Sequence, residues 1–247
     1  MPAGHVTVLT TATCFMNVTH FVSITLATCL LAGIAQAAPS ILLESLGDSV
    51  RAATSSFDRI PEDRRRELEK ISDFIRSKTT AGETASAIFI CTHNSRRSHL
   101  SQVWAQTAAT YYGVTGFKSF SGGVEVTACN ERTVTALKRA GFEVTDSTGG
   151  MNPVYLVKYS EKAEPIRSFS KLYTDHTNPH GKFVAVMTCD HADANCPLVQ
   201  GASLRAPIHY TDPKVADGTP AEAATYDERS RQIAREMFYM MSLVNSR

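Results

Sequence analysis

The sequence predicts an α/β protein built on a parallel sheet that helices cover on both faces. Three observations lead to this fold class. Apolar runs of strand length alternate along the chain with segments of helical periodicity. Two of these runs, continuous and apolar as buried parallel strands are, lead into a cysteine. The 247 residues, of which 43% are hydrophobic and 20% charged, suffice for one such domain with additional segments.

The first forty residues differ from the rest because they contain no Asp, Glu, Lys or Arg. An apolar run over 21–35 leads into the small-residue pattern Ala35-Gln36-Ala37. We expect residues 1–37 to be a signal peptide, cleaved after about Ala37, and the protein to be exported to the periplasm or secreted without stable membrane association. The run is shorter than the roughly 20 residues of a membrane span. A short anchor, or a cytoplasmic protein with a mis-called start, are the alternatives.

Residues 38–84 predict a helical N-terminal extension and a linker. Apolar residues at helical spacing, among them Leu42, Leu46 and Val50, predict a helix over 41–58. Pro61 followed by two acidic residues is typical of a second helix start. The run Arg64-Arg65-Arg66 is expected to lie on a solvated face. A linker is expected over 79–84.

Residues 85–247 are expected to form the main domain. Its predicted strands and helices follow in this order: a strand over 85–91, a helix over 98–112, a strand over 117–121, a helix over 130–140, strands over 142–145, 183–188 and 205–209, and a helix over 226–244. The segment 147–181 shows no clear pattern apart from a strand-like stretch over 166–172. The net charge of +1 provides no general attraction to nucleic acid or to anionic lipid, so any anion must be recognised locally.

The stretch 89–98, FICTHNSRRS, carries the most specific signal. Cys91 ends a predicted strand, and Arg97 and Ser98 begin a predicted helix. The backbone N–H groups of such a loop and the helix N-terminus bind an oxyanion and favour a thiolate. Arg97 is suited to hold two oxygens of a tetrahedral oxyanion, Ser98 to hydrogen-bond the sulfur, and Asn94 to brace the loop. The oxyanion-binding loop consists of Thr92, His93, Asn94, Ser95 and Arg96.

Asp212 is the candidate acid. It follows the last predicted strand in the sequence Tyr210-Thr211-Asp212-Pro213. Because the carboxyl ends of parallel strands share one edge of the sheet, Asp212 is expected beside Cys91, where it would protonate a leaving oxygen. An Asp before Pro is on its own an ordinary turn residue.

Cys189 and Cys196 form a second cysteine motif. They lie seven positions apart, the first at a strand end and the second before Pro197. This is not zinc spacing, and we expect no metal site. Three interpretations stay open: unrelated free thiols, a static disulfide, or a resolving pair that reduces an oxidised Cys91.

Together these motifs resemble the low-molecular-weight protein tyrosine phosphatase superfamily, and more narrowly its thioredoxin-coupled arsenate reductase branch. The resemblance covers roughly 85–244 and is carried by 90–98, Trp104, 121–125, Asn130, 189–197 and Asp212-Pro213. It implies a three-layer α/β/α fold with a four-stranded parallel sheet. It also implies that Cys91 is the nucleophile for arsenate, that Cys189 and Cys196 resolve the adduct, and that a thioredoxin-like protein is the reductant. No cofactor is implied.

The sequence departs from the family pattern at three positions. His93 stands where the family usually has Gly, Arg96 where the reductases tend to have Cys, and Gln102 where they carry an acid linked to cation binding. Three functions therefore stay open. The first is an arsenate reductase. The second is a phosphatase for phosphotyrosine or other phosphomonoesters, with Tyr210 as a candidate stacking residue. The third is a non-catalytic oxyanion-binding or thiol-redox module.

Overall fold

The computed structural model describes residues 41–195 and 198–245. The expected signal peptide and Cys196 therefore lie outside the described residues. Within these ranges no helix is long and apolar enough to cross a membrane.

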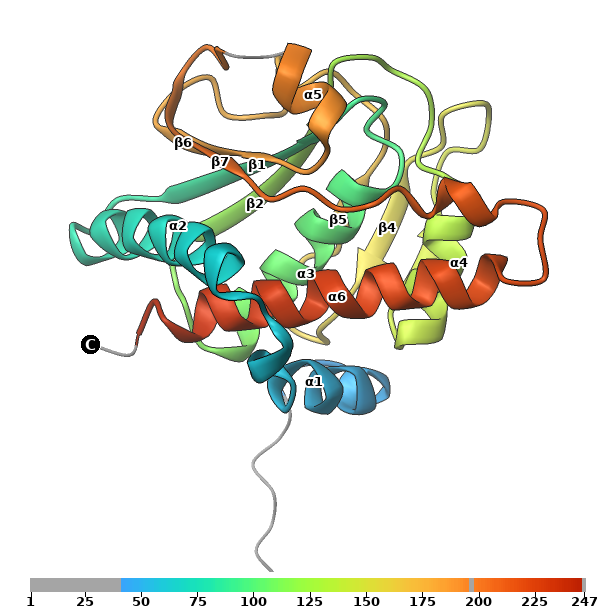
Figure 1. Ribbon diagram of the computed structural model, residues 1–247, viewed down its shortest axis with the longest axis horizontal. Helices are drawn as coiled ribbons and strands as arrows, with labels where there is room; N and C mark the ends of the chain where they lie inside the picture. Colours follow the sequence, from blue (N-terminus) through green and yellow to red (C-terminus); the bar gives the residue numbers. More distant parts are fainter. Residues whose placement is uncertain (1–40, 196–197, 246–247) are drawn as a thin grey trace, which may run out of the picture. The chain divides into compact units, whose positions relative to one another are not determined.

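The main sheet contains four parallel strands in the order β2-β1-β6-β7 (Figure 1). The strands are β1 (Ala85–Cys91), β2 (Phe117–Gly123), β6 (Phe183–Met187) and β7 (Ala202–Pro207). Cys91 at the end of β1 pairs with Gly123 at the end of β2, and Ile90 pairs with Met187 of β6. The predicted parallel sheet is thus confirmed, and the ends of its central strands meet at one edge.

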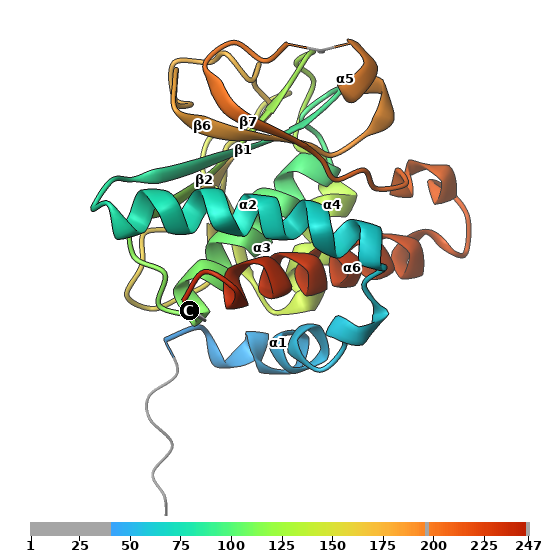
Figure 2. The same ribbon diagram turned by 60° about the vertical axis from the view of Figure 1, so that its left-hand side comes forward.

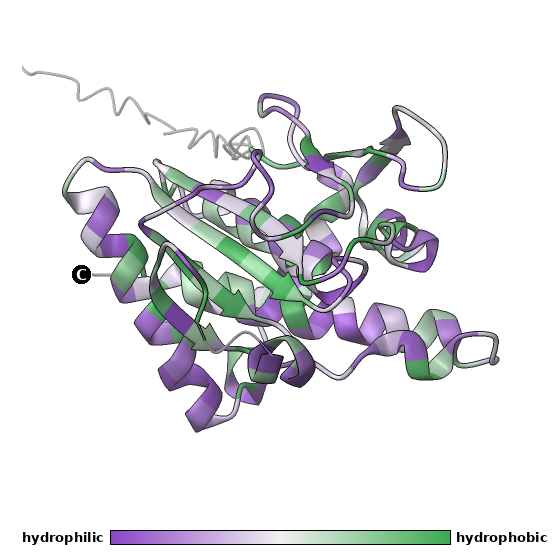
Figure 3. Cartoon of the chain, turned by 90° about the horizontal axis from the view of Figure 1, so that it is seen from above, coloured by the Kyte–Doolittle hydropathy of each residue, from purple (hydrophilic) through white to green (hydrophobic). Residues whose placement is uncertain are grey.

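Alternate residues of the central strand face opposite layers. Ala87 and Phe89 belong to the larger core, where helices α2, α3 and α6 cover the sheet (Figures 1 and 2). Ile88 and Ile90 point to the other face and pack with residues of the short helix α5. These helices are α2 (Glu62–Thr80), α3 (Arg97–Tyr111), α5 (Asp190–Asn195) and α6 (Glu222–Ser242). The fold is therefore a three-layer α/β/α arrangement. Figure 3 shows apolar residues concentrated in the strands.

A second sheet, of three antiparallel strands, was not predicted. It contains β3 (Glu143–Asp146), β4 (Tyr155–Lys158) and β5 (Ile166–Ser168) in that order. The strand expected over 142–145 lies in this sheet rather than in the parallel one, and the strand-like stretch over 166–172 ends at Ser168. Only alternate residues of β4, Tyr155 and Val157, are buried. The strand is four residues long, so it forms no apolar run long enough to be recognised in the sequence. Helix α4 (Glu131–Ala140) precedes this sheet.

The helix expected over 41–58 is interrupted. The chain forms a 3₁₀ turn η1 (Glu44–Leu46), helix α1 (Gly47–Thr54) and a second 3₁₀ turn η2 (Phe57–Arg59). Ser56 Oγ donates a hydrogen bond to the carbonyl of Ala52 at 2.6 Å, and such side-chain bonds compete with continuation of the helix. Helix α2 begins directly after Pro61, as predicted.

The extension packs on the main domain. Leu68, Ile71 and Ile75 of α2 are fully buried, and α1 lies against α6 (Figure 2). The expectation of a solvated arginine run is wrong for Arg64 and Arg65. The Arg64 guanidinium donates to the backbone carbonyl of His209. The Arg65 guanidinium donates to the backbone carbonyls of Ile60 and Phe57.

Candidate active site

Cys91 ends β1 and is almost fully buried, and the loop after it leads directly into α3. Its Sγ lies 3.1 Å from Ser98 Oγ, and Asn94 Nδ2 donates to the same Oγ at 2.9 Å. Asn94 has a φ of 44°, a left-handed conformation that Asn tolerates better than most residues. The structure thus brings together three predicted residues, with the Ser98 hydroxyl directly against the sulfur.

The carbonyl oxygens of the loop accept hydrogen bonds from the surrounding protein. Thr92 O accepts from the amides of 124 and 125, His93 O accepts from Thr127 and Ser170 hydroxyls, and Ser95 O accepts from the amide of Asn130. By contrast, the backbone N–H groups of 93–98 donate to no acceptor among the described residues. Consecutive free amides in a tight loop at a helix N-terminus form an anion-binding cradle.

Gly123 closes one side of this cradle. A Cβ atom at this position would lie 2.6 Å from Glu125 O, 2.8 Å from Asn94 N and 2.8 Å from Thr92 O. All three neighbours are backbone atoms that cannot rotate away. The glycine therefore allows the end of β2 to approach the loop closely.

Arg97 and Asp212 meet across the site, as the shared sheet edge predicts. Arg97 donates from one terminal nitrogen to Asp212 Oδ2 at 2.8 Å and from the other to the carbonyl of Tyr210 at 3.0 Å. Its Nε is buried and has no hydrogen-bond partner among the described residues. Because a buried donor needs an acceptor, this Nε is available to an oxyanion in the cradle. Asp212 Oδ1 also accepts from the Lys214 amide at 3.1 Å.

Arg96 is fixed away from the cradle. Its Nε donates to the hydroxyl of Tyr226 at 2.9 Å, and Tyr226 in turn donates to Asp217 at 2.8 Å. Burial, reinforced by Asp217, raises the pKa of Tyr226 to about 12, so the phenol stays protonated and keeps its donor. Arg96 Nε also lies 3.9 Å from Asp212 Oδ1. Arg96, the first of the two adjacent arginines, therefore contacts the segment around Asp212 and Asp217 rather than the oxyanion cradle.

Cys189 lies beside the loop at the end of β6. Its Sγ is 3.5 Å from Thr92 Oγ1, and its side chain is 1% exposed. The same Thr92 hydroxyl lies 3.2 Å from His191 Nδ1. The structure thus places two of the three cysteines of the motif at the same loop, whereas Cys196 is outside the described residues. The contact of His191 with Thr92 joins residues 99 positions apart, so no local pattern predicts it.

A cavity of about 560 Å³ lies beside the thiol loop and is lined by the loop residues His93, Ser95 and Arg96, but not by Cys91, Arg97 or Asp212. Its lining includes three basic side chains, those of His93, Arg96 and Lys214. His93 Nε2 lies 3.2 Å from Glu125 at the half-exposed rim. With Glu131 as the one acidic side chain of the described lining, the basic groups outnumber the acidic ones, which favours anions near the loop.

Two buried basic groups lie behind the loop, and sequence reasoning missed both. Burial, together with the nearby Lys171, lowers the pKa of His99 to about 3, so the imidazole is neutral. Burial lowers the pKa of Lys171 to about 8. The amide of Lys171 donates to Asn94 Oδ1 at 3.0 Å, and His99 Nδ1 lies 3.3 Å from Ser121 Oγ. These residues lie far apart in sequence, so no local pattern could reveal them.

Tyr210 does not present a stacking face at the mouth. Its side chain is buried, and its hydroxyl donates to Glu236 at 2.8 Å. Burial and the Glu236 carboxylate raise its pKa well above the usual value. The residue supports the strand end before Asp212. Among the described residues, no group of three or more His, Cys, Asp or Glu side chains is arranged to hold a metal ion.

Comparison with known proteins supports the sequence resemblance. No protein-family model matches the chain. An arsenate reductase of Bacillus subtilis is 24% identical over 143 residues, which cover 58% of this chain and 84% of that protein. One of Brevibacillus brevis is 27% identical over 125 residues, covering 51% of this chain and 74% of the relative.

Among solved structures, a mutant of YwlE from Bacillus subtilis aligns with 97% of its chain and 64% of this one, at 12% identity and a TM-score of 0.45. A low-molecular-weight protein tyrosine phosphatase from T. tengcongensis aligns at 13% identity and a TM-score of 0.40, covering 99% of that chain and 64% of this one. Its curated sequence relatives, its parallel sheet and its thiol loop make this chain similar to the low-molecular-weight protein tyrosine phosphatase superfamily, and more narrowly to its arsenate reductase branch.

Proposed function

We propose that this protein is an arsenate reductase that uses a cysteine triad, with Cys91 as nucleophile and Cys189 and Cys196 as resolving residues. The observation that carries the proposal is the position of Cys189, whose sulfur lies 3.5 Å from the hydroxyl of the first loop residue, Thr92. A static structural thiol has no need to lie at an oxyanion loop. A resolving thiol must reach the nucleophile after a short movement.

The proposed reaction begins at the cradle. The Cys91 thiolate attacks the arsenic atom of arsenate, and one arsenate oxygen leaves as water after taking a proton from Asp212. Arg97 and the loop amides stabilise the charge on the remaining oxygens. Ser98 Oγ, 3.1 Å from the sulfur, stabilises the Cys91 thiolate before this attack and again when the last thiol exchange releases it.

The electrons come from two thiols. Cys189 attacks the Cys91 sulfur, the sulfur–arsenic bond breaks, and arsenic keeps the electron pair and leaves as arsenite. Cys196 then attacks Cys189, which releases the Cys91 thiol and leaves a disulfide between Cys189 and Cys196. A thioredoxin-like dithiol reduces that disulfide, so each turnover consumes two electrons from outside the protein.

The test follows NADPH consumption on adding arsenate, with thioredoxin and thioredoxin reductase present. Wild type is expected to turn over many times, whereas Cys189→Ser and Cys196→Ser stop after about one cycle because the adduct or the first disulfide cannot be resolved. Cys129→Ser is the control, because this buried thiol is not one of the three proposed redox cysteines and should be dispensable for turnover. Equal turnover of all four proteins would overturn the triad.

Phosphatase activity is the second candidate, and the Arg97–Asp212 contact favours it. A carboxyl group held at 2.8 Å from the loop arginine is placed to protonate the leaving oxygen of a phosphomonoester. In that case an aryl phosphate would be hydrolysed by wild type and by both resolving-cysteine variants at equal rates. Arsenate would then cause no sustained NADPH consumption.

Export is a further part of the proposal, and it rests on the composition of residues 1–37. An exported form would meet an oxidising compartment, so its reductant would be a thioredoxin-like protein of that compartment. Sequencing the N-terminus of the protein purified from its native cells tests this directly. A terminus near residue 38 supports export, and an intact Met1 in the soluble cytoplasmic fraction contradicts it.

A further inference from the structure

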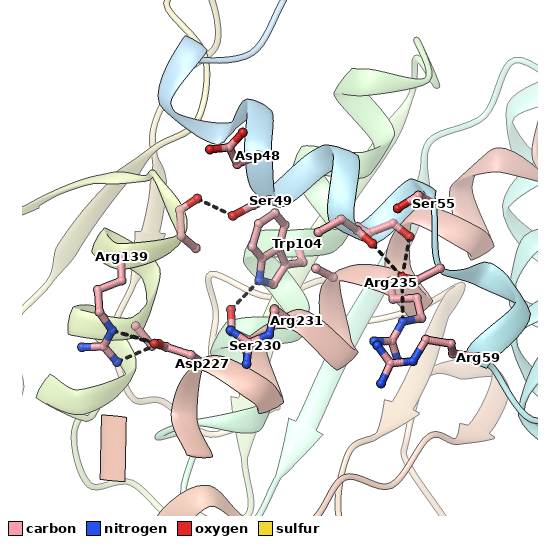
Figure 4. A pocket seen from close by; sticks show the side chains of 16 residues that line it. Asp48, Ser49, Ser55, Arg59, Trp104, Arg139, Asp227, Ser230, Arg231 and Arg235 are labelled. Carbon is pink, nitrogen blue, oxygen red and sulfur yellow. Dashed lines mark hydrogen bonds and ion pairs between the residues drawn. The ribbon is translucent and has the colours of Figure 1, made fainter. Parts of the chain in front are cut away.

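A second cavity, of about 470 Å³, lies where α1 and η2 meet α4 and α6 (Figure 4). None of the residues 91–98 or Asp212 lines it, so it is separate from the thiol loop. Its size is within the range of small-molecule sites in proteins. The lining combines alanine methyl groups, serine hydroxyls, four arginines and the two carboxylates of Asp48 and Asp227.

Arg235 of α6 is the most unusual lining residue. Its side chain is more than nine-tenths buried, and its Nε donates to Ser56 Oγ at 2.9 Å. Its two terminal nitrogens have no hydrogen bond or ion pair with any residue in the described part of the chain. Because these nitrogens are not among the fully buried unpaired atoms, they face the open space of the cavity, where an anion could accept from them.

Arg59 of η2 lines the same end of the cavity, as Figure 4 shows. It likewise makes no hydrogen bond or ion pair within 41–195 and 198–245. The other two arginines of the cavity are neutralised, Arg139 by Asp227 at 2.7 Å and Arg231 by Glu228 at 3.0 Å. Arg59 and Arg235 are therefore the two lining arginines without a direct ion pair to a described residue, although Arg235 also interacts electrostatically with the neighbouring Glu236.

We propose that this cavity binds a small organic anion whose phosphate or carboxylate group lies between Arg59 and Arg235. The guanidinium groups supply several donors in a planar arrangement that suits either oxyanion. The body of the ligand would lie along the apolar part of the lining, which consists of Ala52, Ala53, Ala136, Ala140 and Ala234. The ligand would join the N-terminal extension to the main domain, because Arg59 and Arg235 belong to these two parts.

The cavity contains its own spectroscopic probe. Trp104, the one tryptophan of the sequence, lines it, and its indole N–H donates to Ser230 Oγ, another lining residue, at 2.9 Å. A ligand in the cavity should therefore change the emission of Trp104. Trp104 belongs to α3, which begins at Arg97 of the thiol loop. Binding at the thiol loop could therefore also change the Trp104 emission, and a control must distinguish the two sites.

The experiment titrates the full protein with phenyl phosphate and, separately, with benzoate while Trp104 emission is recorded. We expect a saturable change with at least one probe. Arg59→Ala should weaken its binding by about tenfold or more, since a charge-assisted hydrogen bond is lost. Arg235→Lys tests the buried partner with its charge retained, and Arg66→Gln, an exposed arginine of α2 outside the cavity, is the matched control.

The outcomes separate the possible sites. Binding that is lost in Arg59→Ala and retained in Arg97→Lys supports the cavity, and the probe that binds more tightly identifies the ligand as a phosphomonoester or a carboxylate. A response that disappears in Arg97→Lys but persists in Arg59→Ala belongs to the thiol loop and overturns the proposal. The absence of a saturable response to either probe overturns it as well.

Discussion

Arg97 donates to the carboxylate of Asp212 at 2.8 Å and, from its other terminal nitrogen, to the carbonyl of Tyr210 at 3.0 Å. One side chain therefore connects the oxyanion loop after β1 to the segment after β7, at the opposite side of β6 in the sheet. The acid and the loop are held together before a substrate arrives. Such preorganisation lowers the cost of reaching the transition state.

We expect Asp212→Asn to lower kcat by about 10²–10⁴-fold, because the variant has no proton to give the leaving oxygen. Its stability should hardly change. Asp212 Oδ1 caps the following 3₁₀ turn by accepting from the Lys214 amide, and Asn is an equally good cap. Turnover assays and thermal unfolding measure the two effects separately.

Asp58→Asn is the control for this substitution, because Asp58 is exposed and distant in sequence from the site. An Asp212→Asn enzyme with wild-type kcat would show that another group supplies the proton. A large loss of stability in the same variant would show instead that the carboxylate is mainly structural.

Gly123→Ala tests the close approach of β2 to the thiol loop. The new Cβ would lie within 2.8 Å of three backbone atoms of the loop and its surroundings, so the cradle must move. We expect a loss of about 1–3 kcal/mol in the free energy of unfolding and a larger loss of oxyanion binding. Gly181→Ala, with open space around its Cβ, is the control. Unchanged phosphate inhibition in Gly123→Ala would show that the cradle tolerates the shift.

The sequence predicted the thiol loop because its information is local. A strand, a five-residue loop and a helix follow one another within 85–111, and the strand end, the free amides and Ser98 all derive from that order. Asp212 could be predicted as a member of the same site because the carboxyl ends of parallel strands lie at one edge of the sheet. Neither prediction needs knowledge of side-chain packing.

The remaining site residues depend on contacts across the fold. Tyr226 accepts a hydrogen bond from Arg96, which lies 130 positions earlier in the sequence. Ser170 donates to the carbonyl of His93, 77 positions earlier. Tyr210 was a candidate stacking residue whose side-chain direction the sequence does not reveal, and it is buried because Glu236 of α6 accepts its hydrogen bond. The antiparallel sheet was missed because its strands are short and little buried: β3 has no buried residue, and β4 and β5 bury only alternate residues.

His99 should make the stability depend on pH. Its pKa is about 3 in the folded protein against 6.5 for the ordinary group, chiefly because it is buried. Between these values the unfolded chain binds more protons, so its contribution to stability is present above pH 6.5 and is lost as the pH falls toward 3. From pH 7 to pH 5 we expect this residue to cost about 2 kcal/mol. Urea unfolding at both pH values measures it.

His99→Gln should remove that part of the pH dependence, whatever its effect on stability at pH 7. His176→Gln is the control, because the His176 side chain is 89% exposed. If wild type and His99→Gln lose the same free energy between pH 7 and pH 5, then His99 is not neutral in the folded state.

Cys129 should be chemically inert in the folded protein. Burial raises its pKa to about 12, and its side chain is 2% exposed, so the thiolate that reacts with alkylating agents is scarce and inaccessible. We expect iodoacetamide at neutral pH to leave Cys129 unmodified until a denaturant is added, as peptide mass spectrometry would show. Alkylation of Cys129 in the native protein at the rate of the unfolded chain would contradict this.

Arg64 should connect the N-terminal extension to the acid-bearing segment. It donates to the carbonyl of His209 at 2.5 Å, its guanidinium lies 5.4 Å from the centre of the Tyr210 ring, and its Nε is 3.8 Å from the buried Glu236. Burial raises the pKa of Glu236, and Arg64 is the main group opposing that shift. Arg64→Met should therefore lower the free energy of unfolding at pH 7 by about 2 kcal/mol or more.

The double variant Arg64→Met/Glu236→Gln should recover part of that loss, because no charge then remains buried without its partner. The coupling energy from the two single variants and the double variant isolates the pair. Additive losses would mean that the hydrogen bond to His209, rather than the charge of Glu236, makes Arg64 important. In either case kcat should fall together with stability in Arg64→Met, because Tyr210 carries the carbonyl that holds Arg97. A stable Arg64→Met enzyme with wild-type kcat would show that the extension does not influence the position of the acid.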